Sequence, residues 1–319
     1  MIFNRKIKAK NKELFSLYTL VFLVILIPIL ISPQFRSKQN LINILNQLAP
    51  VGFVALGQTL VIITTGIDLS VGAVMSMTTA IAATQMNYGD MNSVIISIFY
   101  IFAAALFIGF INGLIISKLE LEPLIVTLAT GSIITGLTLL ILPYPGGFCP
   151  NCFTDFLLYK VMDFLPLAFI YFLIIFFIVY LILSQTAFGR YIYSVGGSSK
   201  KSKLSGINVD KVLIKVYMMS AFLASLSGLS LAARMRSGDP LAGDSFTLMS
   251  VAAVLVGGTT FSGGRGGVLQ TLAGVIILGV LSVILNIFGV SPFYQNVLTG
   301  MIIVAAVIYS SKKKNKEKG

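Results

Sequence analysis

Apolar residues dominate ten stretches of this chain, and short polar segments separate one stretch from the next. The stretches lie near residues 14–32, 44–64, 71–87, 93–117, 124–142, 165–184, 212–233, 247–261, 268–287 and 294–310. Most are close to the roughly 20 residues that an α-helix needs to cross the hydrocarbon core of a bilayer. The pattern therefore predicts an all-α fold, a polytopic transmembrane helical bundle of about ten spans.

The succession of apolar stretches predicts a single transmembrane domain over residues 14–310. A basic segment, residues 1–13, precedes it, and a basic tail, residues 311–319, follows it. Two longer polar loops interrupt the alternation, over residues 143–163 and 185–211. The first span lacks a small-residue cleavage pattern, so we expect it to remain in place as an anchor.

Composition supports a membrane protein. Charged residues make up 11% of the chain, against about 25% in a typical soluble domain. The mean hydropathy is +0.94, so lipid is the expected solvent. The sequence pI of about 9.7 does not indicate nucleic-acid binding, because the basic residues lie in short loops beside apolar spans, where membrane orientation explains them.

Charge also predicts the orientation in the membrane. Ten spans place both termini on one side. If that side is the cytoplasm, the inner segments hold 18 of the 23 basic residues, at positions 5, 6, 8, 10, 12, 118, 190, 200, 201, 203, 211, 215, 265, 312, 313, 314, 316 and 318. Arg36, Lys38, Lys160, Arg234 and Arg236 fall outside, with Asp90, Asp155, Asp163, Asp239 and Asp244 in the expected outer loops. This asymmetry predicts two cytoplasmic termini.

Residues 64–72 break an otherwise continuous apolar run from Val51 to Ala83. Gly66 and Gly72 permit non-helical backbone, which at membrane depth needs cover from protein or a water-filled cavity. Asp68 is costly near lipid, so it has either a partner or a task. It either caps the helix that starts near Ser70 from a cytoplasmic turn or takes part directly in transport.

A second glycine-rich break spans residues 257–267. It has no Gly-Lys-Ser/Thr ending and no preceding strand, so it is not a phosphate-binding loop, and the inside-positive pattern accounts for Arg265. A shift of 195 residues aligns Thr64 and Thr65 with Thr259 and Thr260. Paired interrupted helices are typical of a transport pathway, so the sequence predicts interruptions near both 64–72 and 257–267.

The span near 124–142 carries more polar residues than the others. Its hydroxyl groups belong to Thr127, Thr130, Ser132 and Thr135, and its glycines are Gly131 and Gly136. Small residues and hydroxyls suit close helix packing, which is the simpler interpretation. The alternative is the wall of a cavity for a hydroxylated ligand.

The loop over residues 185–211 contains a short predicted helix. Ser198 or Ser199 can cap its start and Gly206 can end it, which leaves about two turns that carry Leu204 among three lysines. A helix of this length does not stand alone in water. It needs support from the membrane domain or from a second protein, and we expect the second protein.

Three motifs together resemble one known family. They are Gly66–Gly72 (GIDLSVG), Gly189–Gly197 (GRYIYSVGG) with Leu204–Val209 (LSGINV), and Val256–Gly267 (VGGTTFSGGRGG). In this order and at this spacing they resemble the signatures of the inner-membrane permeases of ribose-type ABC sugar importers. The resemblance extends from about Asn40 to Val307.

The resemblance implies a multi-pass permease in the cytoplasmic membrane that works as a homodimer, or as a heterodimer with a paralogue. It would receive a pentose or hexose, ribose first, from an extracytoplasmic sugar-binding protein, and a separate cytoplasmic ATP-binding subunit would drive it. The candidate substrate pathway then comprises Thr64, Thr65, Asp68, Ser70, Thr127, Thr130, Thr259 and Thr260. The candidate ATPase-coupling residues are Gly189, Arg190, Lys200, Lys201, Leu204, Ser205, Gly206 and Ile207.

One departure from the family pattern is the basic run Ser199–Lys203, which opposes a helix dipole at that position.

Cys149 and Cys152, in the expected outer loop, are the only cysteines. A local disulfide or two free thiols suits them better than a redox site, because nothing nearby lowers a thiol pKa. Two cysteines and no histidine make a poor metal site and exclude histidine-based catalysis. The sequence therefore predicts no metal, no cofactor and no enzyme activity in this chain.

Two other classes of function are weaker alternatives. A stand-alone secondary transporter or facilitator would need ion-coupling carboxylates within its spans, and Asp68 is the lone candidate. A membrane-embedded enzyme would need a paired acid, a nucleophile with a base, or a ligand cluster, and the sequence has none of these.

Overall fold

The computed structural model of the protein describes residues 2–86 and 90–316. The expected end of one span at residue 87 and the last three residues of the basic tail lie outside this part. The helices are α1 (Ile2–Ile31), α2 (Lys38–Ile63), α3 (Val71–Gln85), α4 (Met91–Lys118), α5 (Pro123–Ile141), α6 (Asn151–Leu158), α7 (Leu167–Gln185), α8 (Ala187–Gly197), α9 (Ser199–Leu204), α10 (Val209–Met235), α11 (Asp244–Val256), α12 (Val268–Ile287) and α13 (Pro292–Lys316).

The helical membrane fold is confirmed. Each of the ten expected spans corresponds to one helix, namely α1 to α5, α7 and α10 to α13. Within the described residues, seven of these helices are long and apolar enough to cross a bilayer. The half-length helices α3 and α11 span only 15 and 13 residues, which corresponds to about 20 Å each.

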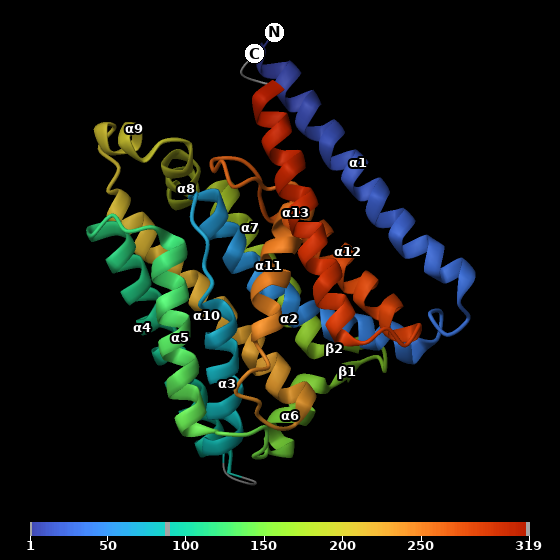
Figure 1. The fold of residues 1–319 in the computed structure, drawn as a ribbon. Helices are drawn as coiled ribbons and strands as arrows, with labels where there is room; N and C mark the ends of the chain where they lie inside the picture. The colour runs from blue at the N-terminus through green and yellow to red at the C-terminus, as the bar shows by residue number, and fades with distance from the viewer. Residues whose placement is uncertain (1, 87–89, 317–319) are drawn as a thin grey trace.

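The bundle has two distinct ends (Figure 1). Both chain termini lie at one end, together with α8, α9 and the loop that follows α11. At the other end lie α6, the end of α3 and the start of α4. We call these the α9 end and the α6 end. A short antiparallel hairpin, β1 (Lys160–Val161) with β2 (Leu165–Pro166), precedes α7.

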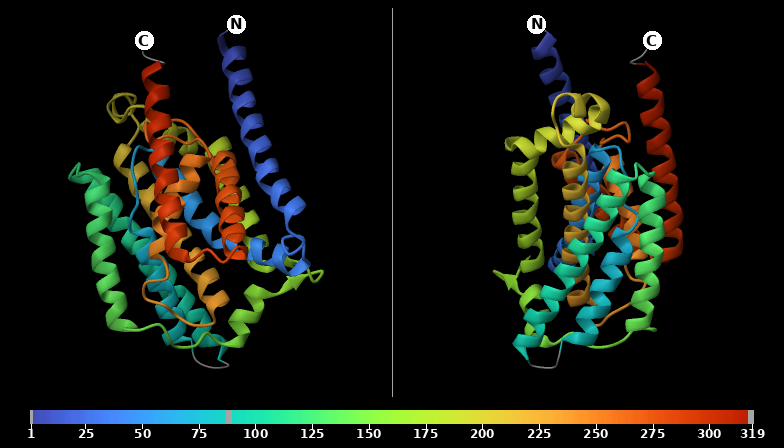
Figure 2. Two further views of the ribbon diagram at one scale, coloured as in Figure 1. Left: turned by 45° about the vertical axis from the view of Figure 1, so that its right-hand side comes forward. Right: turned by 90° about the vertical axis from the view of Figure 1, so that its left-hand side faces the viewer.

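Helices α2 and α10 form the centre of the bundle because they are too polar for its surface. Protein buries 89% of the apolar window of α2 and 61% of that of α10, but 11% of that of α1. Buried polar side chains such as Gln58 and Thr59 on α2, and Ser220 and Ser227 on α10, would be costly in lipid. Helix α1, by contrast, stands at the edge of the bundle and packs mainly on α12 (Figure 2).

Helix α4 approaches α10 unusually closely at two glycines one turn apart. A Cβ atom on Gly109 would lie 2.6 Å from the Met218 Cα, and one on Gly113 would lie 2.5 Å from the Ile214 Cα. This is the small-residue packing that lets transmembrane helices meet backbone to backbone. It fixes α10, the helix that carries Ser220, against α4.

Candidate functional site

Two half-length helices meet head to head inside the bundle. The first seven residues after α2, Thr64–Ser70, are not helical and lead from the α9 end to the start of α3. Residues 236–243 lead in from the α6 end to the start of α11. The two starts touch, because a Cβ atom on Gly72 would lie 2.6 Å from the Gly243 carbonyl oxygen. The amino-terminal ends of both half-helices therefore face the same interior region.

Hydrogen bonds satisfy the irregular backbone of both segments. In residues 236–243, the Gly243 amide donates to Ser76 Oγ at 2.9 Å, and Thr79 Oγ1 donates to the Asp239 carbonyl oxygen at 2.8 Å. In residues 64–70, the Leu69 amide donates to Thr127 Oγ1 at 3.1 Å. Non-helical backbone at membrane depth is tolerated only with such partners, so helices α3 and α5 act as the scaffold for both segments.

Asp68 is the centre of a buried polar network. Its Oδ1 accepts from the Ser70 amide at 3.0 Å and from Ser70 Oγ at 2.6 Å, and its Oδ2 accepts from Ser220 Oγ at 2.8 Å. Asn112 Nδ2 donates to Ser70 Oγ at 3.0 Å. The side chains of these four residues are buried. The network joins the start of α3 to α4 and α10.

A groove opens beside this junction, between α3, α5 and α11. Its volume is about 620 Å³, within the range of ligand sites. Its polar lining consists of Ser132, Thr135, Asp244 and Thr247, and the remainder is Leu69, Ala73, Leu128, Gly131, Gly136, Leu139 and Leu248. Hydroxyl groups, one carboxylate and leucine side chains thus share one wall.

The α9 end closes around the second glycine-rich segment, residues 257–267. The Gly264 amide donates to the Ile63 carbonyl oxygen at 2.9 Å, and Tyr193 Oη donates to the Gly266 carbonyl oxygen at 2.9 Å. Gly196 packs directly on Ile63, where a Cβ atom would overlap the carbonyl oxygen. The end of α2, helix α8 and this segment therefore form one packed unit.

Comparison with known proteins places the chain in a family. The profile described as branched-chain amino acid transport system / permease component matches residues 40–307. The chain belongs to this permease family. It is therefore a membrane permease and not an enzyme. No solved structure gives a significant match.

Several relatives resemble the permease over nearly their whole length. The ribose import permease protein RbsC of Bacillus subtilis is 39% identical over 92% of this chain and 91% of its own. RbsC of Escherichia coli K12 is 37% identical over 96% of each chain. The galactose/methyl galactoside import permease protein MglC of Escherichia coli K12 is 33% identical, over 97% of this chain and 99% of its own.

Seven of the eight expected pathway residues of the permease fall into two groups. Asp68, Ser70 and Thr127 lie together at the start of α3. Thr64, Thr65, Thr259 and Thr260 lie at the α9 end, and Thr130 bonds within α5, to the Val126 carbonyl oxygen at 3.0 Å. None of the eight lines the groove, although Leu69, Leu128 and Gly131 are direct chain neighbours of four of them.

Three details of the sequence interpretation need correction. Asp68 does hydrogen-bond the start of α3, but from a buried segment inside the bundle and not from a turn at its surface. The offset of 195 residues does not pair equivalent segments, because 64–70 precedes a half-helix whereas 257–267 follows one. The segment that mirrors 64–70 is 236–243, which enters the bundle from the opposite end, where the sequence predicts only an outer loop.

The predicted loop 185–211 of the permease is mostly helical. Thr186 caps α8, with its Oγ1 accepting from the Gly189 amide at 3.2 Å, and Ser198 caps α9, with its Oγ accepting from the Lys201 amide at 3.3 Å. Gly206, with φ of 82°, ends α9 as expected. Helix α8 itself is not predicted from the sequence, because its glycines and polar residues mask the amphipathic pattern.

The expected coupling residues differ in exposure. Leu204 is 82% exposed, and Arg190, Lys200, Lys201, Ser205 and Gly206 are also exposed. Gly189 is buried, and Ile207 packs against the permease's own core. The sequence predicts both Leu204 and Ile207 as coupling residues for the ATP-binding subunit. In the structure Leu204 is exposed and therefore available to a partner, whereas Ile207 packs inside the permease.

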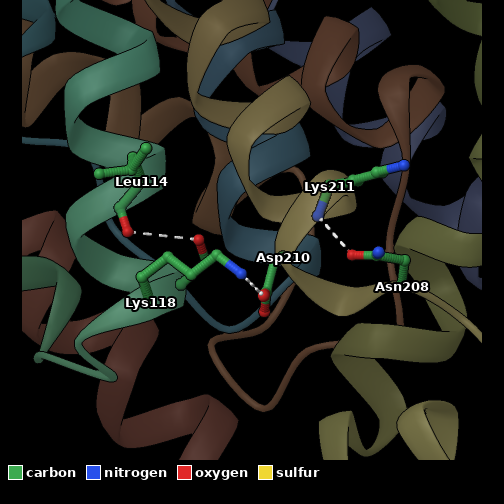
Figure 3. A network of polar contacts seen from close by, with 6 residues as sticks. Leu114, Lys118, Asn208, Asp210 and Lys211 are labelled. Carbon is green, nitrogen blue, oxygen red and sulfur yellow. Dashed lines mark hydrogen bonds and ion pairs between the residues drawn. The ribbon is translucent and has the colours of Figure 1, made fainter.

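An ion pair fixes the base of this helical segment (Figure 3). Lys118 Nζ, at the end of α4, lies 2.7 Å from Asp210 Oδ2 in the first turn of α10. Asn208 caps α10, its Oδ1 accepting from the Lys211 amide at 3.0 Å. An exposed pair of this kind contributes at most about 1 kcal/mol. The cap and the ion pair therefore hold in place the part of the chain that directly follows Ile207.

The two cysteines lie at the α6 end and are free thiols. Cys149 is buried against residues of α3, α4 and α10, while Cys152, in α6, is partly exposed. Burial raises the pKa of the Cys149 thiol to about 11. A thiol with so high a pKa is a poor nucleophile at neutral pH, which agrees with the non-redox interpretation.

Sequence reasoning misses the groove residues Asp244, Thr247 and Leu248. The sequence places Asp244 in an outer loop, but in the structure it begins the half-helix α11 beside Gly72. An Asp one residue after a glycine at the start of an apolar run is a helix-start signal. The sequence alone does not show that this helix begins inside the bundle.

Proposed function

We propose that this chain is the permease subunit of an ATP-driven importer that moves a monosaccharide, ribose first, across the cytoplasmic membrane. The relatives that are 37–39% identical are named as ribose import permeases. Those named for fructose and galactose are 32% and 33% identical. The order of similarity favours ribose over a hexose.

The observation that carries the proposal is the groove at the meeting point of α3 and α11. A monosaccharide presents hydroxyl groups on its edge and C–H groups on its faces. The groove offers the hydroxyls of Ser132, Thr135 and Thr247 together with leucine side chains. Such a mixed lining, at a junction of interrupted helices, is typical of a transport site near the middle of the bilayer.

We further propose that the α9 end faces the cytoplasm and receives the ATP-binding subunit. Of the 23 basic residues, 18 belong to segments expected on that side, and the figures place both termini there with α8 and α9. An exposed leucine beside lysines is a good anchor for a partner with an apolar pocket and an acidic rim. The sugar-binding protein then docks at the α6 end.

A dimer completes the transport path in this proposal. The groove is lined by residues of both α5 and α11, and its apolar lining residues Leu128 and Leu248 are exposed. A second permease, either a copy of this chain or a paralogue, would close the groove and leave a path between the two subunits. Lipid covers the remaining apolar faces.

A stand-alone facilitator is the second candidate, and Asp68 is the observation that bears on it. A coupling carboxylate must be accessible to its ion, whereas both Asp68 oxygens are buried and hydrogen-bonded to serines.

The test that separates the importer subunit from a facilitator is purification of the tagged permease from its own membranes in mild detergent. We expect an ATP-binding subunit to co-purify at a fixed ratio. Purification of the permease alone, with undiminished sugar uptake in cells depleted of ATP, would favour the facilitator.

A further inference from the structure

The groove between α3, α5 and α11 contains one charged side chain among its lining residues, the carboxylate of Asp244. Asp244 is exposed to the groove and occupies the first turn of α11. In the part of the chain that the structure describes, no hydrogen bond or ion pair engages this carboxylate. A carboxylate within a membrane domain is costly and marks a functional position when it has no structural partner.

The helix start supports a negative charge on this carboxylate. The first turn of a helix favours an anion through the exposed backbone amides and the helix dipole. The start of α3 also has a carboxylate nearby, because Asp68 accepts a hydrogen bond from the amide of Ser70, the residue before α3. The two acidic residues therefore offset the partial positive charges of the two helix starts, which would otherwise favour an anionic ligand.

The other polar groups of the groove complement a carboxylate. An ionised carboxylate only accepts hydrogen bonds, whereas the hydroxyls of Ser132, Thr135 and Thr247 both donate and accept. Thr247 lies one turn after Asp244 on α11, so the two side chains share one face of that helix. A ligand with several adjacent hydroxyl groups can donate two of them to Asp244 and exchange hydrogen bonds with the remaining residues.

We propose that Asp244 is a specificity-determining residue that selects a neutral polyhydroxyl ligand and rejects anionic sugars, such as sugar phosphates and sugar acids. The inference rests on the proposed function for the identity of the ligand, a neutral monosaccharide. The charge selection itself depends only on the groove. Asp244 acts by accepting two ligand hydroxyls and by repelling a second negative charge.

Charged thiol reagents test the electrostatic part without any transport. The background is Cys149→Ser with Cys152→Ser, and Leu248→Cys introduces a thiol in the groove one turn from Asp244, at an exposed position. The rates of modification by a cationic and an anionic methanethiosulfonate are compared with and without Asp244→Asn. Tyr144→Cys, at a position 81% exposed in the connection between α5 and α6, is the control.

We expect Asp244→Asn to lower the cation-to-anion rate ratio at Leu248→Cys by about tenfold, from Coulomb's law at the 5–6 Å spacing of residues four apart on a helix. The ratio at Tyr144→Cys should stay constant. An unchanged ratio at Leu248→Cys would overturn the proposal. Failure of both reagents to reach the groove would overturn it as well, because a sugar could then not enter.

Uptake separates this inference from the proposed function. In membranes that hold the complete importer, Asp244→Asn should lower ribose uptake about tenfold through the loss of a charged acceptor, and Asp163→Asn, at the outer hairpin, should leave it unchanged. If the unmodified importer moves no monosaccharide, the proposed function fails while the reagent result stands. If it moves ribose and Asp244→Asn moves it equally well, the specificity role fails and the function survives.

Discussion

At the scale of single residues, Asp68 shows how a buried carboxylate can serve structure. Three donors surround it, the Ser70 amide, Ser70 Oγ and Ser220 Oγ. We expect Asp68→Asn to retain most sugar uptake, because the Asn carbonyl oxygen still accepts from Ser70 and the Ser220 hydroxyl can turn to accept from the amide. Asp68→Leu leaves several buried donors without partners, at about 1–3 kcal/mol each, and should abolish uptake.

The measurement is uptake at matched abundance in the membrane, with Ser220→Ala as the control that removes a single donor. Equal loss of uptake in Asp68→Asn and Asp68→Leu would contradict the positioning role. That result would indicate that the charge itself takes part in transport.

The cysteines provide a residue-scale test of orientation. A membrane-impermeant maleimide applied from outside should react mainly with the partly exposed Cys152. Cys149 should react slowly, because burial raises its pKa to about 11. Since the thiolate is the reactive form, its fraction at Cys149 rises about tenfold for each pH unit between 7 and 9 and stays small throughout.

Labelling rates of Cys152→Ser and Cys149→Ser in intact cells, at pH 7 and pH 9, are the measurement. We expect Cys152→Ser to lose nearly all labelling at pH 7 and to regain some at pH 9. Labelling that requires access from the α9 end would show that the orientation is inverted.

At the scale of the elements, the expected coupling residues Leu204 and Ile207 have different roles. Leu204 is 82% exposed, and burying a leucine in a partner stabilises a complex by about 1.5–3 kcal/mol. We therefore expect Leu204→Asp to weaken ATPase binding about tenfold or more, while Lys203→Ala changes it little. Ile207→Asp is the matched control, because it should lower the thermal stability of the permease itself.

Co-purification of the ATPase and the melting temperature of each variant distinguish the two effects. Normal coupling of ATP hydrolysis to uptake in Leu204→Asp would mean that α9 is only a basic tether. Loss of thermal stability in Leu204→Asp would mean that Leu204 packs inside the permease and is not available to a partner.

The elements also show what sequence can predict. The spans are predictable because an apolar run of about 20 residues has one stable environment, the bilayer. The start and end of α9 are predictable from Ser198 and Gly206. The half-helices are not, because 15 or 13 apolar residues have the same pattern whether they begin at the surface or inside the bundle. Only contacts between distant segments, such as that of Gly72 with Gly243, show where α3 and α11 start.

The candidate site is less predictable than the fold for the same reason. The sequence singles out the segments around Asp68 and Thr127, but helix rotation decides which neighbour of these residues faces the groove. Leu69 and Leu128 line the groove, whereas their chain neighbours Asp68 and Thr127 do not. The sequence places Asp244 in an outer loop, because an acidic residue before an apolar run usually lies at the membrane surface.

At the scale of the whole molecule, the proposed function assigns a separate task to each part of the fold. In that proposal the α6 end receives the sugar-binding protein, the groove at the junction of α3 and α11 holds the sugar, and the α9 end, which carries α8 and α9 (Figure 2), receives the ATP-binding subunit. The direct contacts of Ile63, the last residue of α2, with Gly196 and Gly264 connect the α9 end to the segment that leads to the start of α3. We therefore expect a movement of α8 to reach the start of α3 through these backbone contacts.

The most direct test of an ATP-driven monosaccharide permease is ribose uptake into proteoliposomes that contain this chain and its ATP-binding subunit, with the sugar-binding protein outside and ATP inside. We predict accumulation of labelled ribose against its gradient, dependent on ATP and on the binding protein, and abolished by Leu204→Asp. Ribose equilibration at the same rate without ATP and without the ATP-binding subunit, or no uptake of any monosaccharide, would contradict this account.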